Sequence, residues 1–200
     1  MLSVQQIPDA VGYYFAGFVD GEGSFNISFR KRPDYKLPWK VSLCLNVSQK
    51  DRSILTLLQT HLQCGTIRYK CDDVWFFEVN NLVEIREHVI PFFSRFGFLS
   101  AKKKRDFAIF KRMAHLMGQG AHLRREGIAE LLKLRRKMND GGKRKYDDQA
   151  ILAAFGVVES SETIRQTFEA VTALEDDIVR PAWRHAEPGR NDLARPETAE

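Results

Sequence analysis

The spacing of apolar and polar residues changes several times along the chain, and each change predicts a new element. Apolar residues fill most positions at 13–20, which is typical of a short buried helix. Apolar and polar residues then alternate at 24–32 and again at 40–48, which indicates two strands with one dry face each. The prolines and polar residues at 33–38 predict that these strands form a hairpin.

A second helix and a second hairpin are predicted by the same signals. Leucine and isoleucine recur at helical spacing in 51–62, and two short strands are expected at 66–70 and 74–79. Another helix starts at Asn81, its expected N-cap, with Glu84 three residues later as in a capping box. The order helix, strand, strand, helix, strand, strand, helix predicts an α+β fold with an αββαββα core and an antiparallel sheet.

Basic helices are predicted to follow Pro91, which we expect to end the preceding helix. They cover 102–117 and 121–138. The first opens with K-K-K-R at 102–105, where four cations oppose the helix dipole and need an external anion such as a phosphate. The segment 139–145 is expected to be a flexible basic linker.

A single domain is expected from the length of the chain. Its 200 residues, 44% of them hydrophobic, suffice for one core, which we place at 1–178 together with C-terminal helices at 147–155 and 161–176. The last segment, 179–200, has almost no apolar periodicity and is expected to be disordered.

Charge is distributed unevenly and points to a polyanionic partner. Residues 1–145 hold 26 Lys and Arg against 14 Asp and Glu, whereas 146–200 hold 5 against 12. A solvated basic face is the ordinary alternative, but the polar faces of the predicted strands carry the residue types that contact phosphates and base edges. The candidate DNA-binding residues are Asn26, Ser28, Arg30, Arg32, Lys40, Ser42, Asn46, Arg68 and Lys70.

The most unusual stretch is F-A-G-F-V-D-G-E-G at 15–23. Its small residues allow another backbone to approach, and its acids lie where a helix presents unpaired carbonyls, which makes an oxygen-rich site suited to Mg²⁺. A core helix with a glycine cap is the ordinary interpretation. The stretch closely resembles the signature of the LAGLIDADG homing endonucleases, of the single-motif type.

The resemblance implies a metal site at the end of this helix. It identifies Glu22 as a metal ligand, with Gly21 beside it and Asp20 as a further candidate. The implied cofactor is Mg²⁺, with Mn²⁺ or Ca²⁺ as substitutes. The resemblance also implies catalytic roles for Gln49, which supports the metal-site water, and for Lys102, which offsets developing charge, with Lys103 or Lys104 as alternatives.

The resemblance further implies a homodimer that makes a metal-dependent double-strand break in a long pseudo-palindromic DNA target and so promotes intron mobility. The helix at 13–21 would form the dimer interface through Ala16, Gly17 and Asp20. An intron RNA maturase or a DNA-binding regulator of the same fold is the alternative. Double-stranded DNA and a second copy are the expected partners, with no membrane and no small-molecule substrate.

Cysteine usage and composition give an expectation about location. The three cysteines form no C-x-x-C pair, and no secretory leader or membrane-length apolar run is seen, so we expect an intracellular protein. Organelles and bacteria both remain open, and the Ala- and Arg-rich C-terminal third favours a bacterial cytoplasm.

Overall fold

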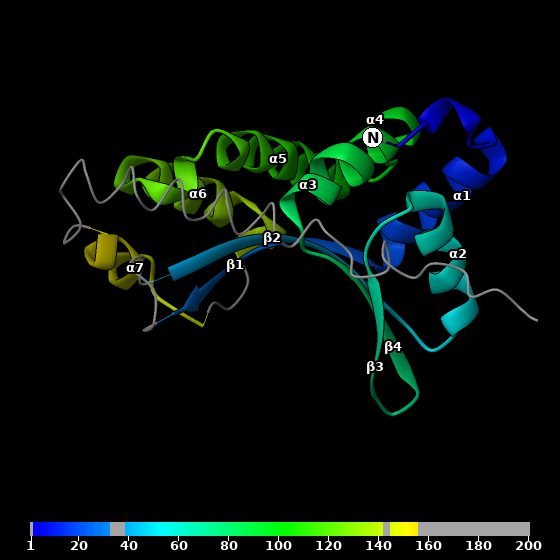
Figure 1. Ribbon diagram of the computed structural model, residues 1–200, viewed down its shortest axis with the longest axis horizontal. Coiled ribbons are helices and arrows are strands. Elements are labelled where there is room, and N and C mark those ends of the chain that lie inside the picture. The colour runs from blue at the N-terminus through cyan, green and yellow to red at the C-terminus, as the bar shows by residue number, and fades with distance from the viewer. Residues whose placement is uncertain (1, 33–38, 142–144, 156–200) are drawn as a thin grey trace, which may run out of the picture.

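The computed structural model of the protein describes residues 2–32, 39–141 and 145–155 (Figure 1). The αββαββα order and the α+β class are confirmed. The expected helix at 161–176, the tail at 179–200 and the turn at 33–38 lie outside the described residues. The elements are η1 (Val4–Gln6), α1 (Asp9–Glu22), β1 (Gly23–Lys31), β2 (Trp39–Gln49), α2 (Arg52–Leu62), β3 (Thr66–Cys71), β4 (Val74–Val79), α3 (Leu82–Glu84), η2 (Ile85–Val89), α4 (Ile90–Phe96), α5 (Ala101–Gly118), η3 (Ala121–Leu123), α6 (Arg125–Lys137), η4 (Asn139–Gly141) and α7 (Asp148–Phe155).

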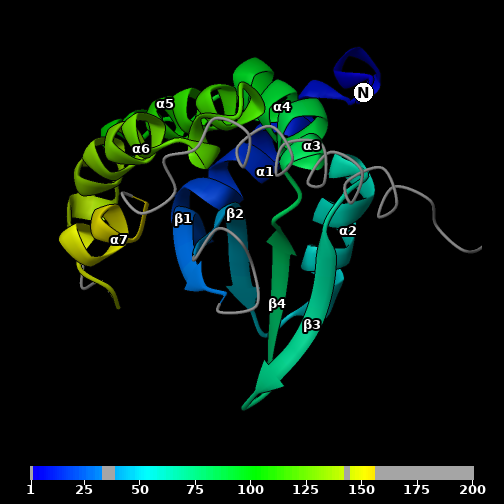
Figure 2. The ribbon, with the colours of Figure 1, turned by 60° about the vertical axis from the view of Figure 1, so that its left-hand side comes forward.

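The four strands in the described part of the chain form one antiparallel sheet in the order β1-β2-β4-β3. Pairing between β1 and β2 runs without a slip from Gly23 opposite Val47 to Lys31 opposite Trp39. Figure 2 shows α4, α5 and α6 over one side of the sheet, while the β3–β4 hairpin extends away from them. The buried members of the alternating pattern face the helices, so the polar members form the opposite face.

A cluster of aromatic rings joins β1 to the helices above it. The ring of Phe25 lies 4.8 to 6.1 Å, between centroids, from those of Phe93, Phe98, Phe107 and Phe110. Burying one phenylalanine stabilises the fold by roughly 1.5–3 kcal/mol. This cluster therefore fixes the position of α5 relative to the start of β1, where the candidate site lies.

Helix α1 is longer than the sequence pattern predicts. It begins at Asp9, directly after Pro8, and continues through Gly21 to Glu22. It ends where Gly23 takes an extended conformation, with φ −86° and ψ 156°, and opens β1. A glycine costs a helix only about 1 kcal/mol, and the fully buried Val19 helps to hold this last turn in place.

The prediction that Pro91 ends its helix was wrong. The chain stays helical from Leu82 to Phe96. The five residues of η2, which directly precede α4, are wound as a π-helix. The wider turn lets Ile90 donate its N–H to the carbonyl of Ile85. Pro91 then lies in the first turn of α4 and has no N–H to donate, and the carbonyl of Glu87, four residues earlier, accepts the N–H of Leu2 at 3.0 Å instead.

The C-terminal helices also depart from the prediction. The segment expected to be one helix at 121–138 is divided into η3 and α6, with the extended Arg124 between them. Ile128, Leu131 and Leu132 on α6 are buried. Within the described part of the chain, no helix combines the length and hydropathy that a bilayer span requires.

Candidate active site and nucleic-acid interface

The end of α1 presents Glu22 at a junction without a loop. Gly23 follows at once as the first residue of β1, and its N–H donates to the carbonyl of Val19. A Cβ on Gly23 would lie 2.7 Å from that same carbonyl oxygen, so only glycine allows the helix to pass directly into the strand. Glu22 is exposed, and within the described residues its carboxylate makes no hydrogen bond or ion pair. It is therefore free to bind a cation.

Asp20 has a different environment. Its Oδ2 accepts hydrogen bonds from the backbone N–H groups of Leu99, at 3.1 Å, and Ser100, at 2.9 Å, and its Oδ1 accepts one from the Ser100 hydroxyl. Burial raises the pKa of Asp20, but these bonds and the charge of Lys103 outweigh it and hold the pKa below its usual value. Asp20 thus joins the end of α1 to the start of α5.

The two lysines that open α5 point to different partners. Lys103 is half-buried, and its Nζ donates to the carbonyl of Gly23, the residue directly after α1. Desolvation lowers the pKa of Lys103 and outweighs the opposing charge of Asp20. Lys102 is exposed, and its Nζ lies 2.9 Å from Oδ2 of Asp140. The structure therefore brings Lys103, rather than Lys102, to the end of α1.

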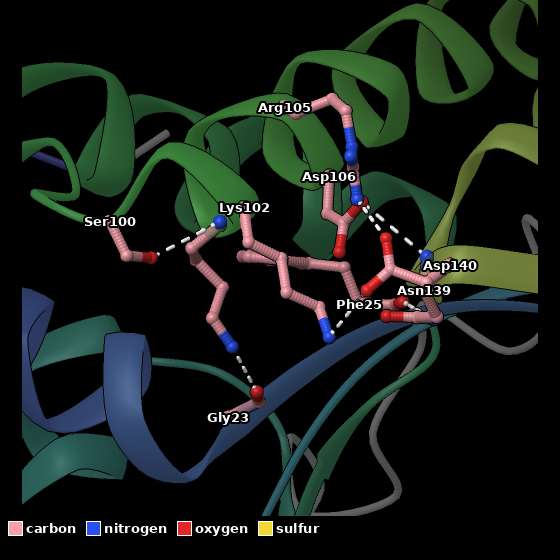
Figure 3. A network of polar contacts seen from close by, with 9 residues as sticks. Gly23, Phe25, Ser100, Lys102, Arg105, Asp106, Asn139 and Asp140 are labelled. Atoms are coloured by element: carbon pink, nitrogen blue, oxygen red, sulfur yellow. Dashed lines mark hydrogen bonds and ion pairs between the residues drawn. The ribbon is translucent and has the colours of Figure 1, made fainter.

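The expected flexible linker begins with a fixed turn (Figure 3). Asn139 Nδ2 donates to the carbonyl of Phe25 at 2.9 Å and to Oδ1 of Asn26 at 3.1 Å. Asp140 accepts from Arg105 at 2.5 Å as well as pairing with Lys102. Part of the charge at the start of α5 is thus compensated within the chain, where the sequence predicted an external anion. Residues 142–144 of the expected linker lie outside the described part.

Gln49 is the last residue of β2 and lies near the same site. The pairing of Gly23 with Val47 places Gln49 two residues further along β2, on the face that the helices cover. Its Oε1 accepts the N–H of Lys50 at 2.9 Å. Three element ends therefore meet here: those of α1 and β2 and the start of α5.

The pairing register places most of the predicted DNA-binding residues on the open face of the sheet. Opposed pairs on this face are Asn26 with Cys44, Ser28 with Ser42, and Arg30 with Lys40, and Asn46 pairs with both Ser24 and Glu78. Arg68 shares the face through its pairing with Phe76, and Lys70 follows two residues later on β3. Arg32 lies just beyond the end of β1.

Two residues on this face were not singled out from the sequence. Glu78 forms an ion pair with Arg68 and accepts a hydrogen bond from the Cys44 thiol at 3.3 Å. Burial, reinforced by the charge of Glu78, raises the pKa of Cys44 to about 12, so the thiol stays protonated as the donor. The alternation along β4, with Trp75 and Phe77 on the dry face, was the signal that could have located Glu78.

The exposed side of α1 carries Tyr13 and Tyr14, which are 59% and 57% exposed. A Cβ built on Gly17 or Gly21 would meet no atom within 4 Å, so these positions are open. Ala16, by contrast, is only 3% exposed and packs inside the chain. Of the residues expected at the dimer interface, Gly17 is therefore open while the core of the same chain covers most of Ala16.

Comparisons with known proteins agree with this fold. A family model described as LAGLIDADG endonuclease matches residues 15–114, half of the chain. The chain is 31% identical over 132 residues to a probable intron-encoded endonuclease 2 of Neurospora crassa, covering 64% of this chain but only 29% of that protein. That relative is eukaryotic and gives no support to the expected bacterial host.

Solved structures extend the match to three dimensions. An archaeal intron-encoded homing endonuclease, I-Vdi141I, in complex with DNA, aligns with a TM-score of 0.67 and 28% identity, covering 74% of this chain and 96% of that one. I-SmaMI bound to an uncleaved DNA target in the presence of calcium ions aligns with a TM-score of 0.64 and 27% identity, covering 71% of this chain and 48% of that one. The chain belongs to the LAGLIDADG endonuclease family.

Proposed function

We propose that this protein is a homing endonuclease that cuts both strands of a long DNA target with the help of a divalent cation. The observation that carries the proposal is the free carboxylate of Glu22 at the end of the signature helix, next to a half-buried lysine and a polar sheet face. The family membership and the DNA bound in two similar structures support the same substrate.

Glu22 and the carbonyl of Gly21 would hold the cation. Hard oxygen ligands suit Mg²⁺, which usually binds to one or two carboxylates and keeps several waters or substrate phosphates. The bound cation would lower the pKa of its water and offset charge on the phosphate. The calcium in one similar structure supports the use of a divalent ion by that protein, and Mg²⁺ is our proposal for this one.

Lys103 is proposed to stabilise the charge that develops on the phosphate. Its Nζ already lies beside Gly23, and its reduced pKa reflects a desolvated site in which a cation interacts more strongly with an anion. Lys102 remains the other candidate, and its ion pair with Asp140 would have to open first. Gln49 would orient water from the end of β2.

Two copies are proposed to act together through the exposed side of α1. Gly17 and Gly21 leave room for a close approach, and two-fold symmetry would place one Glu22 from each copy near the interface. Each copy would then cut one strand of a pseudo-palindromic target. The polar sheet face, with Arg30, Lys40 and Asn46, would lie along the major groove.

The test uses a library of duplexes with randomised sequence and captures new double-strand ends. Cleavage of a defined family of sequences is expected with Mg²⁺ and none with EDTA. Glu22→Gln should keep sequence-selective binding and lose cleavage, because the amide keeps the shape but not the charge. Asp20→Asn is the matched control and should retain more activity, since Asp20 bonds to the α5 start. Selective binding without cleavage by the wild type would instead indicate a maturase or regulator.

A further inference from the structure

One row of side chains on the open sheet face contains an acid among hydroxyl and amide groups. Residues Ser24, Asn46, Glu78 and Thr66 pair in turn across all four strands, so their side chains share this face. The charged residues predicted to read DNA on this face are all basic. A carboxylate among them repels the DNA phosphates. Glu78 should therefore weaken DNA binding unless it accepts a hydrogen bond from a base.

The contacts of Glu78 fix the orientation of its carboxylate and leave it able to accept further hydrogen bonds. Its Oε2 pairs with Arg68, and its Oε1 accepts from the Cys44 thiol at 3.3 Å. Its side chain is 19% exposed, whereas that of Arg68 is 62% exposed. An ionised carboxylate has about four acceptor positions. Glu78 therefore has a fixed orientation and remaining capacity toward the open side.

The major groove offers few donors to such an acceptor. They are the amino groups of cytosine N4 and adenine N6, and adenine adds the N7 acceptor beside its amino group, which disfavours a carboxylate. Arg68, held next to Glu78, presents the donors that suit guanine O6 and N7. We propose that Glu78 is a specificity-determining residue that accepts a hydrogen bond from a cytosine amino group, while Arg68 contacts guanine in the adjacent base pair.

The position of the row indicates which bases are read. Ser24, in the same row, directly follows Gly23 at the end of α1, where the candidate metal site lies. The cytosine should therefore lie in the inner part of each half-site, near the cleavage position. This inference rests on the proposed function, because it assumes that the sheet face lies on DNA.

The experiment selects bound duplexes from a randomised library in EDTA, so that cleavage does not enter. The full chain, Glu78→Gln, Glu78→Ala and Arg68→Ala are compared. Glu126→Gln is the control, since it makes the same charge change at an exposed position on α6. Thermal unfolding of each variant checks that it is folded.

The wild type should prefer cytosine at one inner position of each half-site. Glu78→Gln should change that preference to adenine by roughly tenfold or more, because glutamine can both donate to N7 and accept from N6. Glu78→Ala should lose the preference without gaining another, Arg68→Ala should keep the cytosine, and Glu126→Gln should match the wild type.

Two results would overturn the inference alone. One is an unchanged profile for Glu78→Gln. The other is loss of the same cytosine preference in Arg68→Ala, which would mean that Glu78 only orients Arg68. If the folded wild type enriches no sequence at all, the proposed function fails and the inference falls with it.

Discussion

Gly17 offers a direct test of how two copies of the chain would meet. A Cβ at this position meets no atom within 4 Å inside the protomer. Replacing a helical glycine with leucine also removes most of a propensity penalty of about 1 kcal/mol. Gly17→Leu is therefore expected to leave the protomer at least as stable as the wild type, with a free energy of unfolding up to about 1 kcal/mol higher.

The same leucine should weaken the dimer. Overpacking a close contact costs about 1–3 kcal/mol per added side chain, and two-fold symmetry introduces two leucines at once. The dimerisation free energy should therefore fall by about 2–6 kcal/mol, which raises the dissociation constant by roughly 30-fold or more.

Sedimentation velocity over a range of protein concentrations measures the association, and urea unfolding of the dissociated chain measures the protomer. Gly12→Ala is the matched control, because a Cβ there would overlap the buried ring of Phe96 and should lower protomer stability. The reasoning is refuted if Gly17→Leu associates as tightly as the wild type, or if the wild type itself is monomeric at micromolar concentration.

Three further predictions test the surroundings of the site. Asp20→Ala should lower the free energy of unfolding by about 1–2 kcal/mol through loss of its hydrogen bonds. Because the folded-state pKa of Asp20 is lowered, this difference should be full at neutral pH and disappear as pH falls through that pKa, which urea unfolding at several pH values would measure. Lys103→Met should slow single-turnover cleavage about 100-fold or more, whereas Lys102→Met should have little effect, and the reverse order would assign the role to Lys102. Asp140→Asn should free Lys102 and Arg105 for phosphate and steepen the salt dependence of DNA binding, and an unchanged slope in a salt titration would show that these cations do not face DNA.

Much of the fold follows from local sequence signals. The alternating segments at 24–32 and 40–48 correspond to β1 (Gly23–Lys31) and β2 (Trp39–Gln49) within one residue at each end. Alternation determines which side chains share a face, because successive residues of a strand point to opposite sides. The N-cap at Asn81 was also predicted correctly, and its side chain accepts from the N–H groups of Val83 and Glu84.

The sequence was less informative where one local pattern allows several arrangements. Helix α1 is apolar on most sides, so its pattern does not say which side is covered, and only packing shows that Ala16 is buried while Gly17 is open. Pro91 usually ends a helix, yet the π-helical turn before it keeps this one continuous. The first outcome depends on neighbours that are distant in sequence, and the second on a local turn geometry.

The same distinction between local and tertiary determinants applies to the candidate site. The sequence by itself determined the signature, the acids at its end and the basic run at 102–105, because these are properties of adjacent residues. Only the tertiary structure decided that Asp20 is engaged while Glu22 is free, that Lys103 rather than Lys102 reaches Gly23, and that the turn at Asn139 is tied to β1. The partners in these contacts are about 80 to 114 residues apart along the chain. No local spacing encodes such pairs, since they form only when the packed core brings α1, α5 and the end of α6 together.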